Sequence, residues 1–214
     1  MYLAGVTRPD ISYAVSKLSR FTSNPGDDHW KALERVCRYL RGTSDYGIHY
    51  TGYPHVLEGY SDSNWILDAD EIIATSGFVF TLAGAAVAWR SYKQTVSTKS
   101  TAEAERVALE TATNEVEWLR ELLMDLPLLE KPVPPIVMYC DNQSMLAQVM
   151  NAKDNSKSNR HIKRWLKTIR KMRNSGVIAV SYVKTKNNMT DLFTKGLSRN
   201  VISVMSKDMG MRPI

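Results

Sequence analysis

Hydrophobic positions change their spacing along the chain. Over residues 1–50 the apolar residues recur every three or four positions, which predicts two helices joined by a turn at 24–28. After them, short apolar runs at 55–62, 77–82 and 86–90 alternate with turn residues, which is typical of an antiparallel meander of three strands. The pattern therefore predicts a helical lead-in followed by a sheet.

Helices and strands alternate in the second half of the chain. A broad apolar stripe over 102–126 predicts a long helix, and the apolar run Ile136–Cys140 is typical of a buried, parallel strand. Asp141 follows that strand directly, at the edge where α/β sheets place their functional sites. The other elements expected here are helices at 144–150 and 160–173, a strand at 177–183 and a last helix that begins near Asp191.

The composition suits one folded domain with a short appendage. The 214 residues are 43% hydrophobic and 9% aromatic, so a sizeable core is available and global disorder is excluded. The two cysteines, Cys37 and Cys140, are too few for a disulfide scaffold or a zinc site built on cysteines. The sequence contains no run of about 20 apolar residues and no signal peptide, which predicts a cytoplasmic or nuclear protein with no membrane partner.

The positive charge is concentrated in one segment. The net charge is +6, and residues 153–195 hold twelve Lys or Arg against two acids, so this segment carries +10 and the remainder −4. The helix expected at 160–173 places apolar residues on one face and basic residues on the other. A helical face without any acid favours contact with a phosphate backbone. The residues predicted to bind nucleic acid are Lys163, Arg164, Lys167, Arg170 and Lys171.

Four acidic residues lie at the boundaries of predicted elements: Asp62, Glu105, Asp141 and Asp191. Each alone has an ordinary structural explanation, as a turn residue or as an acid at a helix start. If the four converge, their mutual repulsion requires a cation, and carboxylate ligands favour Mg²⁺ or Mn²⁺ over zinc. Two such ions about 4 Å apart suit phosphodiester hydrolysis, because one activates water and the other stabilises the leaving oxygen.

The residues around these acids resemble those of a known family, in motifs that follow one another in order over nearly the whole chain. The motifs at Glu58–Trp65, Thr75–Phe80, Trp89–Gln94, Ser100–Glu105, Tyr139–Gln143 and Thr190–Leu197 resemble the ribonuclease H region of copia-type (LTR) retrotransposon Pol polyproteins. The motifs at Thr7–Ile11 and Arg38–Thr43 resemble the C-terminal end of the reverse transcriptase that precedes this region.

This resemblance implies a ribonuclease H-like α/β fold, with a mixed five-stranded sheet, flanking helices and a short two-helix segment in front. The implied parts are a helical tail of the reverse transcriptase at 1–52, the ribonuclease H-like domain at 53–200 and a C-terminal tail at 201–214. The implied activity is divalent-metal-dependent endonucleolytic cleavage of RNA in RNA–DNA hybrids during reverse transcription. The implied partners are the hybrid and the reverse transcriptase part of the same polyprotein.

The family's metal-binding acids match Asp62, Glu105, Asp141 and Asp191, and the resemblance implies that these residues are catalytic and hold two Mg²⁺ or Mn²⁺ ions. Glu105 is preferred to Glu103 because the family places its ligand just before a small apolar motif, and Glu103 stays an alternative. The paired-aspartate motif of a polymerase is absent, so DNA synthesis by this chain alone is not expected.

The sequence departs from the family at Asn64, Arg106 and Lys163, where family members often have Asp, Tyr and an acid. These departures motivate a second hypothesis, a catalytically weak or inactive remnant that only binds nucleic acid. His161 matches a His-Ile dipeptide of the family but has an ordinary explanation as a residue at a helix start, so no catalytic role is assigned to it. An integrase-type nuclease is disfavoured because its acids run Asp, Asp, Glu along the chain, whereas the Glu comes second here.

Overall fold

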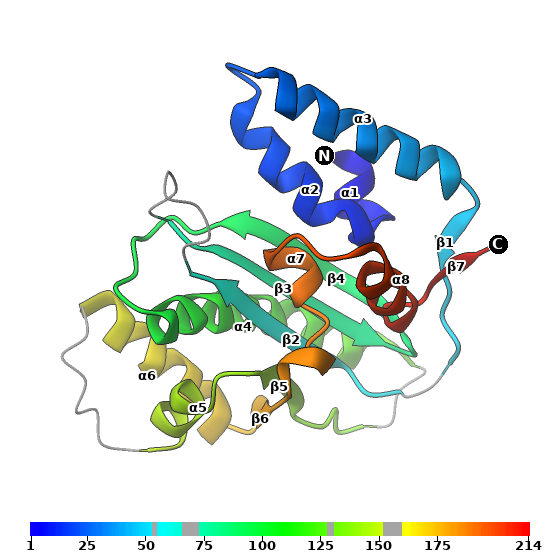
Figure 1. Ribbon diagram of the computed structural model, residues 1–214. Coiled ribbons are helices and arrows are strands. Elements are labelled where there is room, and N and C mark those ends of the chain that lie inside the picture. The colour runs from blue at the N-terminus through cyan, green and yellow to red at the C-terminus, as the bar shows by residue number, and fades with distance from the viewer. Residues whose placement is uncertain (53–54, 66–72, 128–130, 152–159) are drawn as a thin grey trace.

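A mixed sheet of five strands lies at the centre of the molecule (Figure 1). The computed structural model describes residues 1–52, 55–65, 73–127, 131–151 and 160–214, with the backbone alone for 160–162. The strands of the sheet are β2 (Glu58–Asn64), β3 (Thr75–Leu82), β4 (Ala85–Lys93), β5 (Ile136–Cys140) and β6 (Ile178–Tyr182).

The central strand β2 joins two halves of the sheet, whose order is β4-β3-β2-β5-β6. On one side β2 pairs antiparallel with β3, which pairs antiparallel with β4. On the other side β2 pairs parallel with β5, which pairs parallel with β6. The mixed five-stranded sheet with flanking helices that the sequence predicts is therefore confirmed.

The helices differ greatly in length, from the 25 residues of the long helix that the apolar stripe predicts to single turns. Among the described residues, no helix is both long and apolar enough to cross a membrane. The helices are α1 (Tyr2–Val6), α2 (Ser12–Leu18), α3 (Asp27–Gly42), α4 (Thr101–Asp125), α5 (Gln143–Met150), α6 (Arg160–Asn174), α7 (Asp191–Thr194) and α8 (Arg199–Asp208), with 3₁₀ turns at Pro9–Ile11, Ser19–Phe21 and Thr185–Asn187.

Helices cover both faces of the sheet (Figure 1). Successive side chains of a strand point to opposite faces, so each strand can contribute to the core on either side. Phe78 and Phe80 of β3 point to the face covered by α4, α5 and α6 and belong to the larger hydrophobic core. Val79, between them, points to the opposite face and packs with Phe193 and Met209 near α7 and α8. Both faces of β3 are consequently buried, which explains the unbroken apolar run Phe78–Phe80.

The N-terminal segment contains three helices where the sequence predicts two. The five residues of α1 are too few to show a helical period, and the helix predicted next is divided into α2 and two 3₁₀ turns. Trp89 Nε1 of β4 donates to the carbonyl of Ala4 at 2.7 Å, which attaches α1 to the sheet face that carries α7 and α8.

A buried ion pair connects the start of α2 with the end of α3. Arg8 and Asp10 lie 2.7 Å apart, and the Tyr39 hydroxyl donates to Asp10 Oδ2 at 2.7 Å. Arg8 also donates to the carbonyl of Thr43 at 3.0 Å. Because Arg8 and Asp10 neutralise each other, burial of the two charges is tolerated. The contacts with Tyr39 and Thr43 hold the end of α3 against the start of α2.

The last residues of the chain, predicted as a tail, form α8 and a short strand, β7 (Met211–Pro213). β7 pairs antiparallel with another short strand, β1 (Tyr46–Ile48), in a separate two-stranded sheet. Neither strand was predicted, since three residues cannot display an alternating pattern. The pairing joins the two segments that flank the five-stranded sheet.

Gly77 allows α7 to lie directly on β3. It pairs with Asp62 in the antiparallel register of β2 and β3. A Cβ atom at Gly77 would overlap the Cβ of Phe193 and come within 3.3 Å of Thr194 Cγ2. Only glycine permits this approach, which brings α7 over the end of the central strand.

We expect Gly77→Ala to destabilise the protein by about 1–3 kcal/mol, because the added methyl group forces α7 off the sheet. Chemical denaturation measures the free energy of unfolding. Gly5→Ala is the matched control: nothing lies within 4 Å of its Cβ position in α1, so that substitution should be neutral or slightly stabilising. Equal stabilities of the two variants would contradict the close approach of α7.

Candidate metal centre

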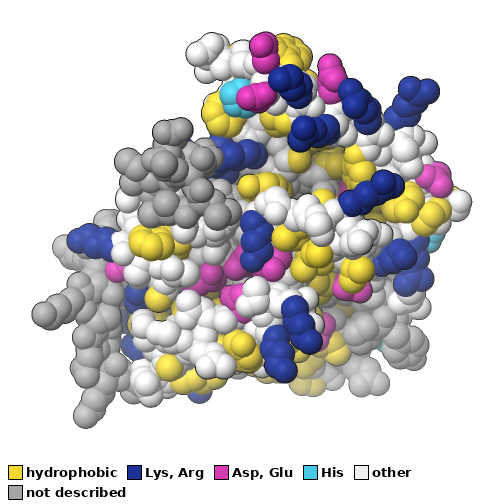
Figure 2. Space-filling view, in the orientation of Figure 1, with side chains coloured by type: hydrophobic (Ala, Val, Ile, Leu, Met, Phe, Trp, Pro, Cys, Tyr) yellow, Lys and Arg dark blue, Asp and Glu magenta, His cyan; other side chains and the backbone are white. Residues whose placement is uncertain are grey.

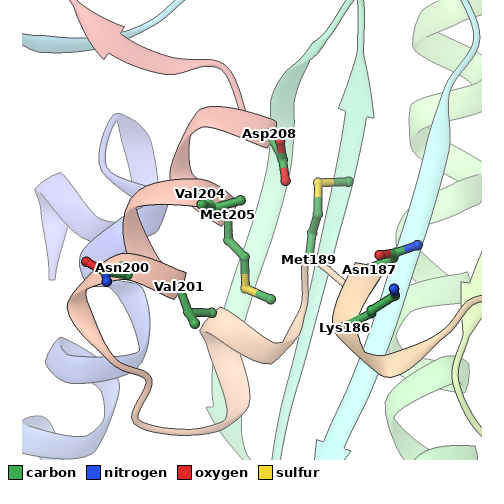
Figure 3. A pocket seen from close by; sticks show the side chains of 8 residues that line it. All are labelled: Lys186, Asn187, Met189, Asn200, Val201, Val204, Met205 and Asp208. Atoms are coloured by element: carbon green, nitrogen blue, oxygen red, sulfur yellow. The ribbon is translucent and has the colours of Figure 1, made fainter.

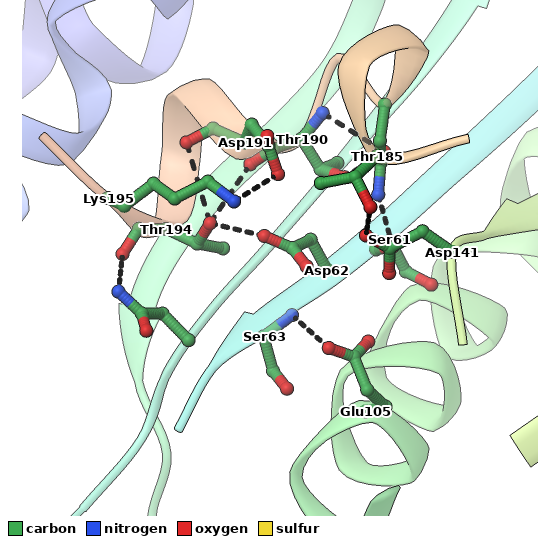
Figure 4. Close-up of polar contacts among 12 residues, drawn as sticks. Ser61, Asp62, Ser63, Glu105, Asp141, Thr185, Thr190, Asp191, Thr194 and Lys195 are labelled. Carbon is green, nitrogen blue, oxygen red and sulfur yellow. Dashed lines mark hydrogen bonds and ion pairs between the residues drawn. The ribbon is translucent and has the colours of Figure 1, made fainter. Parts of the chain in front are cut away.

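Asp62 lies near the end of the central strand β2 and is 4% exposed. The parallel register of β2 and β5 pairs Tyr60 with Tyr139, and two residues further along it leads to Asp62 and Asp141. The Thr194 hydroxyl donates a hydrogen bond to Asp62 Oδ2 (Figure 4). The sheet and α7 together therefore fix the position of this carboxylate.

Asp141 is the first residue after β5 and is half-buried. Its Oδ2 accepts a hydrogen bond from the Thr185 hydroxyl at 2.8 Å. The next residue, Asn142, caps α5, because its Oδ1 accepts from the backbone N–H of Met145 at 3.0 Å. With the helix start already capped by Asn142, the carboxylate of Asp141 remains available to the cluster.

Asp191 is the first residue of α7 and is 6% exposed. Directly after the helix ends, Lys195 Nζ lies 2.7 Å from Asp191 Oδ1. Because α7 has only four residues, tertiary contacts must hold it in place. Ser91 Oγ donates to the carbonyl of Phe193 at 2.6 Å, and Asn64 Nδ2 donates to the carbonyl of Thr194 at 3.2 Å.

The three aspartates converge from three separate elements (Figure 4). Asp62, Asp141 and Asp191 each offer a carboxylate oxygen, and these oxygens all lie within 4.8 Å of one another. Figure 2 shows acidic side chains near the middle of this face of the molecule, with Lys and Arg around them. Such spacing of three oxygens suits a divalent cation that prefers carboxylate ligands.

Glu105 lies beside this triad without belonging to it. Its Oε1 accepts a hydrogen bond from the backbone N–H of Ser63, next to Asp62, at 3.2 Å. Its Oε2 is buried and has no hydrogen-bond partner among the described residues. A buried carboxylate oxygen without a donor is costly, and a cation would satisfy it. The donor set of the site therefore fits a metal ion.

The alternative acid, Glu103, has a different environment. Its Oε2 accepts a hydrogen bond from the backbone N–H of Lys99 at 2.8 Å, and its own N–H donates to Ser100 Oγ at 3.3 Å. The side chains of Glu103 and Ser100 thus each satisfy one backbone donor at the start of α4, in the manner of a capping box. Of these two glutamates, Glu105 contacts the strand that carries Asp62, which favours Glu105 as the ligand.

Burial raises the pKa of Asp62, Glu105 and Asp191 in the absence of a metal. It raises the pKa of Asp62 to about 6; the Thr194 hydrogen bond opposes this, and the charges of Asp191 and Asp141 increase it. Burial also raises the pKa of Glu105 well above its ordinary value, and Asp62 and Asp141 add to the effect. The pKa of Asp191 rises mainly through burial, while its contact with Lys195 opposes the rise.

The basic helix α6 packs its apolar face into the larger core through Leu166, Ile169 and Met172. Arg170, one of the five basic residues predicted to bind nucleic acid, donates to the carbonyls of Gln148 at 2.7 Å and Asn151 at 2.5 Å, at the end of α5. The other four are exposed: Lys163, Arg164, Lys167 and Lys171.

Arg106 is held by contacts with α4 and α5. Arg106, adjacent to Glu105, donates to the carbonyl of Ala102 at 3.1 Å and to Gln148 Oε1 at 2.8 Å, toward α5. The side chain of His161 lies outside the described residues.

Several residues that support the acids were not predicted. The hydroxyl groups of Thr194 and Thr185 each bond one carboxylate, and Lys195 pairs with a third. Asn188 is fully buried, and its Nδ2 donates to the carbonyl of Ser61 at 3.3 Å, which holds the segment before α7 against β2. The cluster of polar residues between Lys184 and Lys195 is the signal that would have found them.

A small hollow of about 270 Å³ lies beside the 3₁₀ turn that carries Thr185 (Figure 3). Met189, Val201 and Met205 line it together with Lys186 and Asp208. None of the clustered acids lines this hollow. The candidate metal centre instead lies at the ends of β2 and β5, beside α7.

Comparison with known proteins gives relatives of one kind over nearly the whole chain. The chain is 37% identical over 211 residues to the retrovirus-related Pol polyprotein from transposon RE2 of Arabidopsis thaliana, which covers 98% of this chain and 14% of that protein. It is 35% identical over 211 residues to the corresponding polyprotein from transposon TNT 1-94 of Nicotiana tabacum, which covers 99% of this chain and 16% of that protein. Over nearly its whole length the chain is therefore homologous to a segment of copia-type retrovirus-related Pol polyproteins, and it spans only about a seventh of their length.

Two other comparisons accompany these. Over 120 residues, 56% of this chain and 84% of that protein, the chain is 48% identical to secreted RxLR effector protein 161 of Plasmopara viticola. Among solved structures, LC11-RNase H1 in complex with an RNA/DNA hybrid aligns with a TM-score of 0.47 and 16% identity, over 64% of this chain and 93% of that chain. No protein-family model matches the chain.

We expect the metal-free protein to lose stability as the pH rises from about 4 to 7. The folded state holds the proton of Asp62 up to a pKa of about 6, against an ordinary value of 3.8, so the stabilisation is present at low pH and is lost as the carboxylate ionises. At about 1.4 kcal/mol per pKa unit, the loss is about 2–3 kcal/mol. Thermal unfolding in EDTA at a series of pH values measures it.

The matched variant is Asp62→Asn, which cannot ionise. Its melting temperature in EDTA should change less over this range and exceed that of the unmodified chain at pH 7. The raised pKa of Asp62 would be contradicted if the unmodified chain became more stable between pH 4 and 7.

Proposed function

We propose that the chain is a ribonuclease H that hydrolyses RNA in RNA–DNA hybrids with the help of divalent metal ions, as part of retrotransposon reverse transcription. The observation that carries this proposal is the convergence of Asp62, Asp141 and Asp191 within 4.8 Å, beside the unpartnered Oε2 of Glu105. Homology to a segment of the Pol polyproteins supports the setting.

The acids proposed to hold two Mg²⁺ or Mn²⁺ ions are Asp62, Glu105, Asp141 and Asp191. When bound, such ions lower the pKa of a water molecule and stabilise the negative charge on the leaving oxygen of a phosphodiester. Oxygen ligands favour these hard cations over zinc. Neutralisation of the carboxylates also removes the mutual repulsion that, in addition to burial, raises the pKa values of Asp62 and Glu105 in the metal-free state.

The residues around the acids hold the carboxylates in position before any substrate binds. Thr194 and Thr185 each donate to one carboxylate, and the backbone N–H of Ser63 donates to Glu105. Such fixed orientation reduces the reorganisation that the reaction requires. Lys195, paired with Asp191 at 2.7 Å, supplies a positive charge beside the cluster in the metal-free state.

The exposed basic face of α6 is proposed to contact the phosphates of the hybrid. Lys163, Arg164, Lys167 and Lys171 lie on a helix that contains no acidic residue. Contacts of this kind position a nucleic acid without reading its sequence, as cleavage of hybrids of many sequences requires. In the polyprotein, the reverse transcriptase part that precedes this segment is the proposed protein partner.

The alternative, a remnant that binds nucleic acid without cleaving it, was motivated by Asn64, Arg106 and the basic helix. Asn64 holds the carbonyl of Thr194, and Arg106 donates toward α5. Both substitutions are thus accommodated beside an intact set of acids, so catalysis is the better-supported proposal. The activity measurement below separates the two, because the remnant would bind the hybrid and leave it uncut.

We expect Mg²⁺-dependent cleavage of a labelled RNA–DNA hybrid by the unmodified chain, and a loss of at least about 100-fold in Asp62→Asn and Asp141→Asn, since each removes a metal-binding charge. EDTA should abolish cleavage, and Mg²⁺ or Mn²⁺ should restore it. Glu105→Gln should lose activity while the matched control Glu103→Gln keeps most of it. A folded, unmodified chain that cleaves no hybrid with either metal would overturn the proposal.

We expect Lys163→Gln combined with Lys167→Gln to weaken hybrid binding and to reduce its salt dependence by about two charges, because two phosphate contacts are lost. Fluorescence anisotropy at several salt concentrations measures both quantities. Arg170→Gln should instead lower the melting temperature, because it removes the donor that caps α5. If the double variant binds as the unmodified chain does at every salt concentration, α6 is not the contact surface.

A further inference from the structure

A cleft of about 700 Å³ lies between α3 and α8, on the sheet face opposite α6. It has the size of a small-molecule site and lies outside the carboxylate cluster. Figure 2 shows apolar side chains exposed between Lys and Arg on this side of the molecule. The apolar residues that line the cleft are Ile11, Ala14, Val36, Leu197 and Ile202, and the rings of Tyr39 and Tyr46 line it as well.

The polar residues of the cleft are mostly basic. Arg35, Arg199 and Lys207 line it and have no ion-pair partner in the described part of the chain. A fourth, Arg38, pairs with Glu34 on the exposed side of α3 at 2.9 Å. The cleft's carboxylate, Asp10, is already neutralised by Arg8. The cleft therefore carries an excess of about three positive charges.

A buried hydroxyl group in the cleft also lacks a partner. Ser206 of α8 lines the cleft and is 2% exposed, and its Oγ has no hydrogen-bond partner among the described residues. A buried polar atom of this kind costs free energy unless something bonds it. This observation is independent of the charge excess and indicates a ligand that carries polar groups into an apolar cleft.

The cleft continues toward the metal centre. A second hollow of about 280 Å³ shares Ala14, Leu197 and Ile202 with it and is also lined by Lys195. Lys195 contacts Asp191 of the carboxylate cluster. The second hollow and Lys195 therefore connect the cleft with the proposed site of hydrolysis.

We propose that this cleft binds a nucleotide, with its base on the apolar floor and its phosphate between Arg35, Arg199 and Lys207. Cationic side chains suit a phosphate, the flat rings of Tyr39 and Tyr46 suit a base, and Ser206 offers a hydrogen bond to its polar edge. The nucleotide is either free or the end of a single strand. Both have the same chemistry, and neither depends on catalysis by the acids.

Isothermal titration calorimetry with the full chain tests the assignment. The probes are adenosine 5′-monophosphate, adenosine, inorganic phosphate and a 5′-phosphorylated single-stranded octanucleotide. We expect the monophosphate to bind at least tenfold more tightly than adenosine or inorganic phosphate. Arg199→Gln combined with Lys207→Gln should weaken its binding at least tenfold, and Ser203→Trp, at an exposed position that lines the cleft, should block it.

Lys163→Gln on α6 is the matched charge control and should leave binding of the monophosphate unchanged. Asp62→Asn should also leave it unchanged, which separates this site from the proposed nuclease activity. If only the octanucleotide binds, and the cleft variants weaken it, the site takes a strand end. The proposal is overturned if neither the monophosphate nor the octanucleotide binds, if binding ignores the cleft variants, or if inorganic phosphate binds as tightly as the monophosphate.

Discussion

The repulsion among buried carboxylates is the constraint on which the rest of the site depends. Three aspartates, on β2, directly after β5 and on α7, bring their oxygens within 4.8 Å of one another, and without a cation the pKa values of Asp62 and Asp191 rise. Such a cluster persists only where the surrounding structure is strong enough to hold it. Two threonine hydroxyls, one lysine and a backbone N–H meet the carboxylates directly.

The shortest α-helix in the described part of the chain, α7, contributes one of the acids and also a contact to another. α7 has four residues and could not form alone, yet it carries Asp191, Thr194 and the neighbouring Lys195. Its position is set by the missing side chain of Gly77 and by Ser91 and Asn64, residues from each of the three antiparallel strands. A site that combines distant segments in this way is stable only when the antiparallel half of the sheet is intact.

Most of the fold could be predicted from the sequence, but only part of the candidate site could. The long helix, the meander and the buried strand before Asp141 follow from hydrophobic spacing, and the structure has them within a few residues. The strands β1 and β7 were missed because three residues carry no periodic signal, and the tail assigned after residue 200 contains a helix. The four acids were chosen by motif; spacing along the chain could not reveal that three converge closely while Glu105 lies to one side.

The roles of polar residues that act through tertiary contacts were harder still to predict from the sequence. Nothing near Thr185 in the sequence indicates that its hydroxyl reaches Asp141, and nothing near Arg170 indicates that it caps α5 from another helix. Such roles depend on which segments meet in space. By contrast, the basic face of α6 was visible at once, because helical periodicity alone places Lys163 and Lys167 together.

The pairing of β1 with β7 has a consequence for the order in which the chain folds. Tyr46 pairs with Pro213, so this small sheet joins residues that lie far apart in the sequence. During synthesis, residues 46–48 leave the ribosome long before residues 211–213 exist. Contacts between such distant segments form late, since a long loop must close first. This sheet can therefore attach the segment after the N-terminal helices only once residues 211–213 have been synthesised.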